Sequence, residues 1–317
     1  MKLFLATVLL LSSGIVSPAH AVIFYSTADP TFNTSAPTGA LAGSGWQWVG
    51  SFDGFTGTPI APGYFLAAHH IQGNVGDTFV FNGVSYTTTA FFDDTVSDLR
   101  IWQINGTFPA WAPIYRGSGE AGRGLVVFGY GLGRGSEILA NGSLAGWRYG
   151  SGGGTLRWGQ NTIRSVVNGG SYWGQLLYAL FDASSNVNQC DLATGDSSGP
   201  VFINDGSGWQ LAGIAAAVDA YFNTTTSGNG FIAAIFDARG LYYGSTGNWN
   251  LVAGSSPVPT GFYATQISAR AAWIDSIVTP PADSPLFSGA QGAILAAGLL
   301  AGGVCALRSR VLREERA

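Results

Sequence analysis

The sequence predicts an all-β fold, and three observations lead to this class. Hydrophobic residues make up 46% and aromatic residues 13% of the 317 residues, while charged residues make up only 10%. A chain this apolar is not disordered. Its 47 glycines supply many turns. Between the turns lie short segments rich in Val, Thr, Tyr and Trp, as in strands. The length suffices for one large or two small domains.

The first half of the chain carries separate strand signals. Residues 46–49 alternate between apolar and polar side chains, and residues 79–86 predict a hairpin because Asn82-Gly83 suits a type I′ turn. A further alternating run covers residues 96–102. Residues 108–113 contain two prolines and break the periodicity, so we expect a crossover to the second half there.

The second half carries a similar series of strands and ends in a short helix. Residues 124–131 form an apolar run that ends in glycines, and residues 201–203 and 209–214 flank a second hairpin turn at Asn204-Asp205-Gly206. A last strand over residues 261–268 leads to a helix that Ser268 would N-cap and that prolines stop near residue 280.

Residues 194–200, Thr-Gly-Asp-Ser-Ser-Gly-Pro, are the best candidate for a reactive site. A serine between small residues on a tight turn can be exposed as a nucleophile, and Ser197 holds that position. The amides of Gly195 and Ser197 can both face one developing oxyanion. An ordinary glycine-rich turn is the alternative.

A base for Ser197 must come from very few histidines. The chain has three, and His20 lies in a segment that resembles a removable export signal. His69 and His70 remain, and either can activate a hydroxyl. Asp98 opens the alternating run downstream, where a buried carboxylate can orient an imidazole.

These segments, in this order, resemble the chymotrypsin/trypsin-like serine proteases. Ala67-Ala68-His69, Ser97-Asp98-Leu99 and residues 195–200 resemble the family's His, Asp and Ser blocks, and residues 261–274 resemble its last strand and C-terminal helix. The similarity covers residues 45–278. It implies two packed six-stranded antiparallel β-barrels that meet near residues 108–120, with a short C-terminal helix.

The resemblance also implies roles for the site residues. Ser197 attacks a carbonyl, His69 takes its proton, Asp98 orients His69, and the amides of Gly195 and Ser197 form the oxyanion hole. His69 is preferred to His70 because it follows Ala-Ala, as in the family.

Two other carboxylates could take the role of Asp98, and one residue differs from the family's pattern. Asp93 and Asp94 are rivals for the position of Asp98. Ser198 stands where the family usually has glycine.

The resemblance places the substrate pocket at Asp191, Ala216 and Val218. Asp191 lies six residues before Ser197, where trypsin-like members carry the carboxylate that selects Arg or Lys. Residues 216–218, Ala-Ala-Val, replace the family's Ser-Trp-Gly, and Val218 narrows the pocket. Asp191 has two interpretations: it selects substrates with a basic residue, or it is an ordinary solvated loop acid.

Activation in this family depends on a new N-terminus that pairs with the Asp before the nucleophile, here Asp196. Removal of an export signal exposes Val22-Ile23, but Phe24-Tyr25 replace the usual two glycines. We therefore expect another partner for Asp196 and no zymogen step.

The two ends of the chain differ from its body. Residues 1–21 resemble a secretory signal with a small-x-small cleavage site at Ala19-His20-Ala21, and residues 22–44 predict an extended arm. A linker over residues 279–285 precedes 22 uncharged residues, 286–307, long enough to span a bilayer. Arginines in residues 308–317 predict a cytoplasmic end. This tail resembles bacterial sorting tails but lacks Pro-Glu-Pro; a buried helix is the alternative.

Composition excludes several classes of protein. Residues 22–285 contain nine Arg, no Lys and sixteen Asp plus Glu, a formal charge of −7, and this acidic balance excludes nucleic-acid binding. The only cysteines are Cys190 and Cys305, so we expect no disulfide within the body. No Cys/His cluster indicates a metal, and no cofactor is expected. Export without disulfides favours a bacterial envelope or surface location.

The sequence therefore predicts an exported, monomeric serine endopeptidase that cuts protein or peptide substrates through an acyl-enzyme. Its tail would contact the membrane or a sorting enzyme. The alternatives are an inactive pseudoprotease that serves as a surface binding module, a non-enzymatic surface protein, and an esterase with the same triad.

Overall fold

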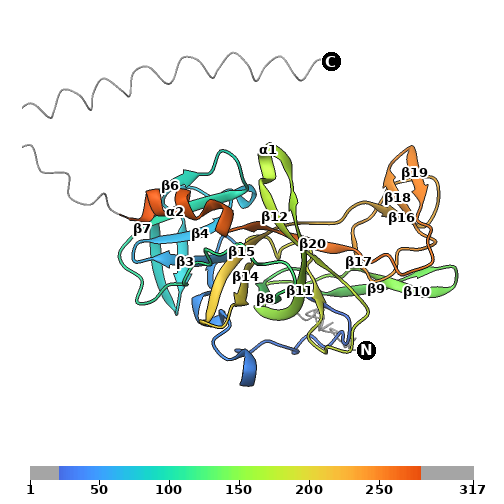
Figure 1. The fold of residues 1–317 in the computed structure, drawn as a ribbon, viewed down its shortest axis with the longest axis horizontal. Helices are drawn as coiled ribbons and strands as arrows, with labels where there is room; N and C mark the ends of the chain where they lie inside the picture. The colour runs from blue at the N-terminus through green and yellow to red at the C-terminus, as the bar shows by residue number, and fades with distance from the viewer. Residues whose placement is uncertain (1–20, 280–317) are drawn as a thin grey trace, which may run out of the picture. The chain divides into compact units, whose positions relative to one another are not determined.

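The computed structural model describes residues 21–279. They contain two closed six-stranded β-barrels built from antiparallel pairs (Figure 1). The predicted fold class, two barrels and a short C-terminal helix, is therefore confirmed. The compact unit ends at Val278. The predicted apolar segment 286–307 and basic tail 308–317 lie outside the described residues, as do residues 1–20 of the predicted signal.

The first barrel, blue to cyan in Figure 1, has the strand order β2-β3-β4-β7-β6-β5. Its strands are β2 (Gly50–Phe52), β3 (Phe55–Ala61), β4 (Tyr64–Ala68), β5 (Thr78–Phe81), β6 (Val84–Asp93) and β7 (Leu99–Asn105). The predicted hairpin joins β5 to β6, and φ angles of 51° at Asn82 and 75° at Gly83 fit its type I′ turn. Aromatic rings fill the barrel: Phe65 and Phe79 stack with centroids 4.0 Å apart.

The second barrel has the order β11-β12-β20-β15-β14-β8. Its strands are β8 (Gly124–Gly129), β11 (Arg157–Asn168), β12 (Gln175–Leu180), β14 (Pro200–Asn204), β15 (Trp209–Val218) and β20 (Gly261–Gln266). The predicted hairpin after Asn204 joins β14 to β15. The one-turn helix α1 (Gly170–Trp173) lies at the tip of the hairpin that joins β11 to β12 (Figure 1).

Two local predictions are wrong. Residues 46–48 form the 3-10 turn η2 (Trp46–Trp48) instead of a strand, because Trp46 and Trp48 both turn onto rings of the second barrel, Phe128 and Phe202. Ser268 does not cap a helix. It opens the 3-10 turn η4 (Ser268–Arg270) before helix α2 (Ala271–Val278), and its hydroxyl donates to the Glu120 carboxylate.

The sequence did not predict the smaller sheets beside the second barrel. One has the order β17-β10-β9 and the other β16-β18-β19 (Figure 1). Their strands are β9 (Arg134–Ala140), β10 (Ser143–Tyr149), β16 (Phe222–Asn223), β17 (Ala233–Ile235), β18 (Tyr242–Ser245) and β19 (Asn248–Leu251). In the predicted arm, η1 (Gly39–Leu41) is a 3-10 turn and β1 (Ile23–Phe24) pairs with β13 (Cys190–Asp191).

One hydrophobic cluster joins the two barrels. It contains Phe52 and Trp102 of the first barrel, Phe202 and Ile214 of the second, and Ile274 of α2, all with no exposed area. Because this core is close-packed, it fixes the loops at the barrel junction. Within residues 21–279, no helix has both the length and the apolar character needed to cross a membrane.

Candidate active site

A single imidazole joins two of the predicted site residues, and it belongs to His70. Its Nδ1 lies 2.6 Å from Asp98 Oδ2, and its Nε2 lies 2.8 Å from Ser197 Oγ. The His70 backbone N–H also donates to Asp98 Oδ1 at 2.9 Å. In the tautomer that suits these contacts, Nδ1 donates to the carboxylate and Nε2 accepts from the hydroxyl. The Asp98 side chain is fully buried, whereas 27% of the His70 side chain is exposed.

Both barrels contribute to this cluster. Strand β4 ends at Ala68, which pairs with Leu99 at the start of β7. The 3-10 turn η3 (His69–Ile71) follows β4 directly, so His70 and Asp98 leave neighbouring strand ends of the first barrel. Ser197 lies in the turn before β14 of the second barrel. The site therefore depends on how the two barrels pack.

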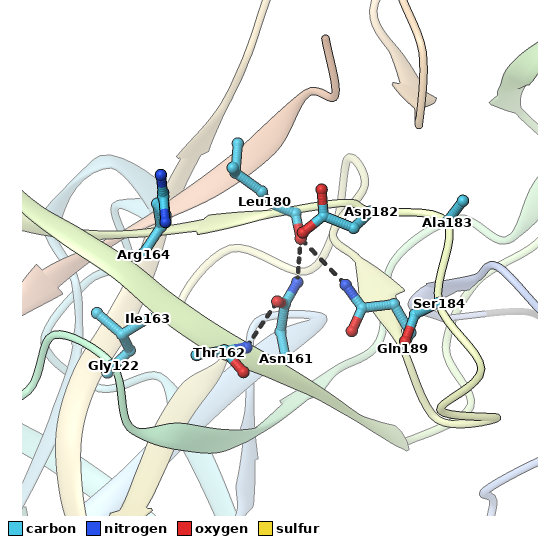
Figure 2. Close-up of a pocket in the computed structure, with 10 residues that line it drawn as sticks. All are labelled: Gly122, Asn161, Thr162, Ile163, Arg164, Leu180, Asp182, Ala183, Ser184 and Gln189. Carbon is cyan, nitrogen blue, oxygen red and sulfur yellow. Dashed lines mark hydrogen bonds between the residues drawn. The ribbon is translucent and has the colours of Figure 1, made fainter. Parts of the chain in front are cut away.

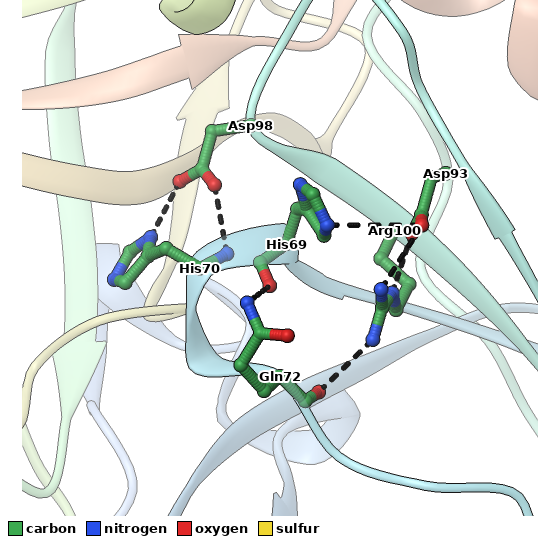
Figure 3. Close-up of polar contacts among 6 residues, drawn as sticks. All are labelled: His69, His70, Gln72, Asp93, Asp98 and Arg100. Atoms are coloured by element: carbon green, nitrogen blue, oxygen red, sulfur yellow. Dashed lines mark hydrogen bonds and ion pairs between the residues drawn. The ribbon is translucent and has the colours of Figure 1, made fainter. Parts of the chain in front are cut away.

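The expectation that His69 faces Ser197 is wrong. His69 points away from Asp98, and its Nε2 lies 3.7 Å from Asp93 Oδ2 (Figure 3). A 3-10 turn has three residues per turn, so successive side chains point about a third of a turn apart. Because His69 and His70 are successive residues of η3, only one of them can face Asp98.

The rival carboxylates Asp93 and Asp94 serve other partners. Asp93 accepts two hydrogen bonds from the Arg100 guanidinium (Figure 3). Asp94 accepts two from Arg270, at 2.5 and 2.7 Å. Such bidentate pairs fix the carboxylate geometry. Of these three carboxylates, only Asp98 has a contact with the His70 ring within residues 21–279.

The turn that carries Ser197 has two amides without an internal acceptor. The amides of Asp196, Ser198 and Gly199 donate to backbone carbonyls at 2.9 to 3.0 Å. The amides of Gly195 and Ser197 donate to no acceptor within residues 21–279. They are the two amides predicted to stabilise an oxyanion, and the turn leaves both available for it.

Ser198, which follows the candidate nucleophile, bridges the barrels. Its backbone has φ 67° and its side chain is fully buried. Its Oγ accepts a hydrogen bond from the Ala68 N–H at 3.1 Å. The pairing of β3 with β4 reaches only Leu66, so Ser198 supplies the acceptor that the strand lacks at Ala68.

Asp196 is bound by backbone amides on both carboxylate oxygens. Gly131 N–H donates to Oδ1 and Ala193 N–H to Oδ2, each at 2.8 Å. The backbone N–H of Val22 also lowers the pKa of this carboxyl, but burial outweighs these donors and raises the pKa to about 7. The expectation that Asp196 has a partner other than Val22 is thus only partly correct.

Of the three predicted pocket residues, two line a cavity beside Ser197. This cavity of about 30 Å³ is lined by Ala216 and Val218 but not by Asp191. The Asp191 side chain turns inward, where it accepts from the Leu192 N–H and from the Thr260 hydroxyl. Burial raises the pKa of Asp191 to about 8.

Sequence reasoning missed Trp173. This residue ends α1, and its ring lies 6.2 Å from the His70 ring, between centroids. It comes from the second barrel and contacts the site across the barrel junction. No motif marks it in the sequence, because only the tertiary fold brings the tip of this hairpin to His70.

A larger cavity of about 340 Å³ lies on the second barrel and includes none of His70, Asp98 and Ser197 (Figure 2). Its amides are already paired: Asn161 Nδ2 and Gln189 Nε2 both donate to the Leu180 carbonyl. In the described part of the chain, no three His, Cys, Asp or Glu side chains group as metal ligands do.

Comparisons with known proteins give structural neighbours only. No family model matches the sequence, and no curated protein matches it. Kallikrein-related peptidase 10 has a TM-score of 0.42 and 16% identity, over 76% of this chain and 98% of that chain. The inactive form of the Rv3671c protease has a TM-score of 0.37 and 17% identity, over 57% and 85%. At these values neither neighbour assigns an activity to this chain.

Proposed function

We propose that this chain is a serine endopeptidase in which Ser197 is the nucleophile, His70 the general base and Asp98 the residue that orients His70. The observation that carries the proposal is the single imidazole with Asp98 at 2.6 Å on one nitrogen and Ser197 at 2.8 Å on the other. The Ser197 distance is within reach for direct proton transfer, and the Asp98 distance is that of a hydrogen bond that can orient the ring.

The chemistry follows from this arrangement. Ser197 Oγ forms a bond to the substrate carbonyl carbon while its proton moves to His70 Nε2, and the carbonyl π electrons move to oxygen. The amides of Gly195 and Ser197 stabilise that oxyanion. When the C–N bond breaks, Nε2 returns the proton to the leaving amine and an acyl-enzyme remains. Water then cleaves the ester with His70 as base.

Asp98 contributes through charge and orientation. Its buried carboxylate faces the Nδ1 that becomes positive when His70 takes the proton. The attraction between the buried carboxylate and the imidazolium is stronger than between the same charges in water, because the local dielectric constant is lower.

Labelling with a fluorophosphonate probe tests this proposal on the full-length chain. The probe should modify Ser197, and both Ser197→Ala and His70→Ala should abolish labelling. His69→Ala is the matched control, because it removes the neighbouring imidazole and should leave labelling intact. Loss of labelling in His69→Ala but not in His70→Ala would reverse the assignment of the base.

A further assay separates peptide from ester substrates. Parallel hydrolysis of a peptide anilide and the corresponding ester gives the reaction class. Hydrolysis of the ester alone would convert the proposal to an esterase. A folded chain that neither labels nor hydrolyses would instead be a binding module.

We also propose that the protein is exported and keeps its body outside the cytoplasm. The signal-like residues 1–21 and the apolar residues 286–307 before terminal arginines support this. N-terminal sequencing of protein from the envelope fraction tests it, and the expected first residue is Val22. A cytosolic protein that retains Met1 would contradict it.

A further inference from the structure

The cavity beside Ser197 is small and has walls of small side chains. It measures about 30 Å³ and is lined by Leu192, Ala193, Asp196, Ser197 and residues 215–218 of β15. Residues 215–217 are all alanine and present only methyl groups. A cavity of this size holds one or two water-sized groups. It therefore surrounds only a few heavy atoms of a side chain.

The position of the cavity decides which substrate group enters it. His70 Nε2 must protonate the leaving amine, so the leaving group lies on the His70 side of Ser197. His70 does not line the cavity. The residue just before the cleaved bond lies on the acyl side, and its side chain is attached to the Cα next to the attacked carbonyl carbon. The cavity is thus the space for the side chain of the residue just before the cleaved bond.

The wall formed by Leu192 is fixed from two directions. Its N–H donates to Asp191 Oδ1 at 2.9 Å, and its carbonyl accepts from the Tyr149 hydroxyl at 3.1 Å. Leu192 and the neighbouring Ala193 are buried, with 2% and 5% exposure. A close-packed wall that is bonded on both its backbone groups does not open for a longer side chain.

The cavity offers nothing to a basic side chain. Asp196 is its one ionisable lining residue, and both oxygens of Asp196 already accept backbone N–H groups. Asp191, which the sequence suggested as a selector of Arg or Lys, does not reach the cavity. A buried ammonium or guanidinium without a partner is strongly unfavourable.

We infer that the substrate carries a small uncharged residue, glycine, alanine or serine, immediately before the cleaved bond. This inference rests on the proposed peptidase function. Alanine fits because one methyl group fills the space. Leucine, phenylalanine, lysine and arginine are too large for the cavity. Valine is the largest side chain that could enter, because Val218 at the end of β15 limits the space.

A matched series of tetrapeptide anilides tests the inference on the full-length protein. The peptides differ only in the residue before the anilide: Ala, Val, Leu, Phe or Lys. We expect kcat/KM for Ala to exceed that for Leu, Phe and Lys by about 100-fold, as expected when a side chain cannot enter its pocket. A preference for Lys, or equal rates across the series, would overturn the inference.

Variants locate the selectivity in the cavity wall. Val218→Gly should raise kcat/KM for Leu relative to Ala by about 10-fold, because it removes the largest side chain at the end of the wall. Val187→Gly, the same change at a residue with 57% exposure that does not line the cavity, should leave the ratio unchanged. Asp191→Asn should leave the order of the five substrates unchanged. A ratio that Val218→Gly does not move would contradict the assignment of this cavity.

The fluorophosphonate probe separates this inference from the proposed function. If Ser197 is labelled and the peptide series favours Lys or Phe, only the side-chain preference fails. For a chain that turns over anilides too slowly, the rates of labelling by Ala, Phe and Lys peptidyl phosphonates give the same comparison. If neither probe type labels Ser197, the proposed function fails and the inference falls with it.

Discussion

Ser198 shows how one residue can connect the two halves of the site. It follows the candidate nucleophile directly, and its hydroxyl accepts the Ala68 N–H two residues before His70. The turn of the second barrel and the strand end of the first barrel are thereby joined by one hydrogen bond. A glycine here would make the turn easier but would leave the Ala68 amide without this acceptor.

Substitution of Ser198 should separate the hydrogen bond from the backbone strain. Ser198→Ala keeps a side chain at φ 67° and loses the acceptor, so the free energy of unfolding should fall by about 1–3 kcal/mol. Ser198→Gly also loses the acceptor but relieves the strain, and should cost less. Urea denaturation measures both, with the exposed Ser256→Ala as control. Equal stability of Ser198→Ala and wild type would show that the bond contributes nothing.

The hairpin of β11 and β12 is the element that most directly couples the barrels at the site. It belongs to the second barrel, yet its tip lies against the loop that carries Asp98. At Gly174 an added Cβ would lie 2.8 Å from the Val96 carbonyl oxygen and 3.0 Å from Ser97 Cβ. The same tip places Trp173 beside His70.

Two glycines of this tip make a matched pair for testing that contact. Gly174→Ala should push the tip away from Val96 and lower the labelling rate of Ser197 by about 10-fold, because small displacements in a reactive site are costly. Gly170→Ala imposes a similar positive φ, 80° against 68°, but meets nothing within 4 Å. It should leave the rate near that of wild type. Equal rates for the two variants would show that the tip does not support the site.

At the scale of the whole molecule, buried carboxyls should set how stability changes with pH. Burial raises the pKa of Asp191 to about 8 and that of Asp196 to about 7. Between about pH 4 and pH 8 the folded chain therefore binds more protons at these groups than the unfolded chain. Their contribution to stability is complete below pH 4 and is lost as the pH rises.

The expected result is a free energy of unfolding that falls from about pH 4 to pH 8 by a few kcal/mol. Hydrogen bonds lower the pKa values of Asp29 and Asp237. These two groups therefore change the stability only below this pH range. Urea denaturation at each pH measures the slope, and Asp191→Asn should reduce it. A stability that rises steadily over this range would contradict the assignment.

Composition and local patterns predicted the all-β class and two hairpins, whereas the two-barrel arrangement was predicted only from the resemblance of the His, Asp and Ser segments to a known family. The Asn82-Gly83 turn specifies its hairpin through positive φ at both residues, and the hairpin after Asn204 is equally local. The choice between His69 and His70 could not be predicted in this way. It depends on the direction of each side chain in one 3-10 turn, which residue spacing alone does not determine.

The pocket shows a second limit of sequence reasoning. Asp191 was placed by its distance along the chain from Ser197 and Val218 by the match of residues 216–218 to Ser-Trp-Gly, but only packing determines which side chains reach the cavity. Asp191 turns inward to Leu192 and Thr260, whereas Val218 lines the cavity. A carboxylate in the expected position is therefore no guide to the charge that a substrate meets.

The burial of Val22 fixes an order of events. At the predicted cut, Ala21 and Val22 are both fully buried, and the Val22 amide lies against Asp196. A peptidase needs its target bond extended and accessible, so this bond is open to cleavage only while the body is unfolded or transiently opened. If residues 1–21 are removed as an export signal, as we propose, the cut must therefore precede closure of the barrels. Under that proposal, removal of the signal and folding compete in time, and the ratio of their two rates decides what fraction of the chains is cut.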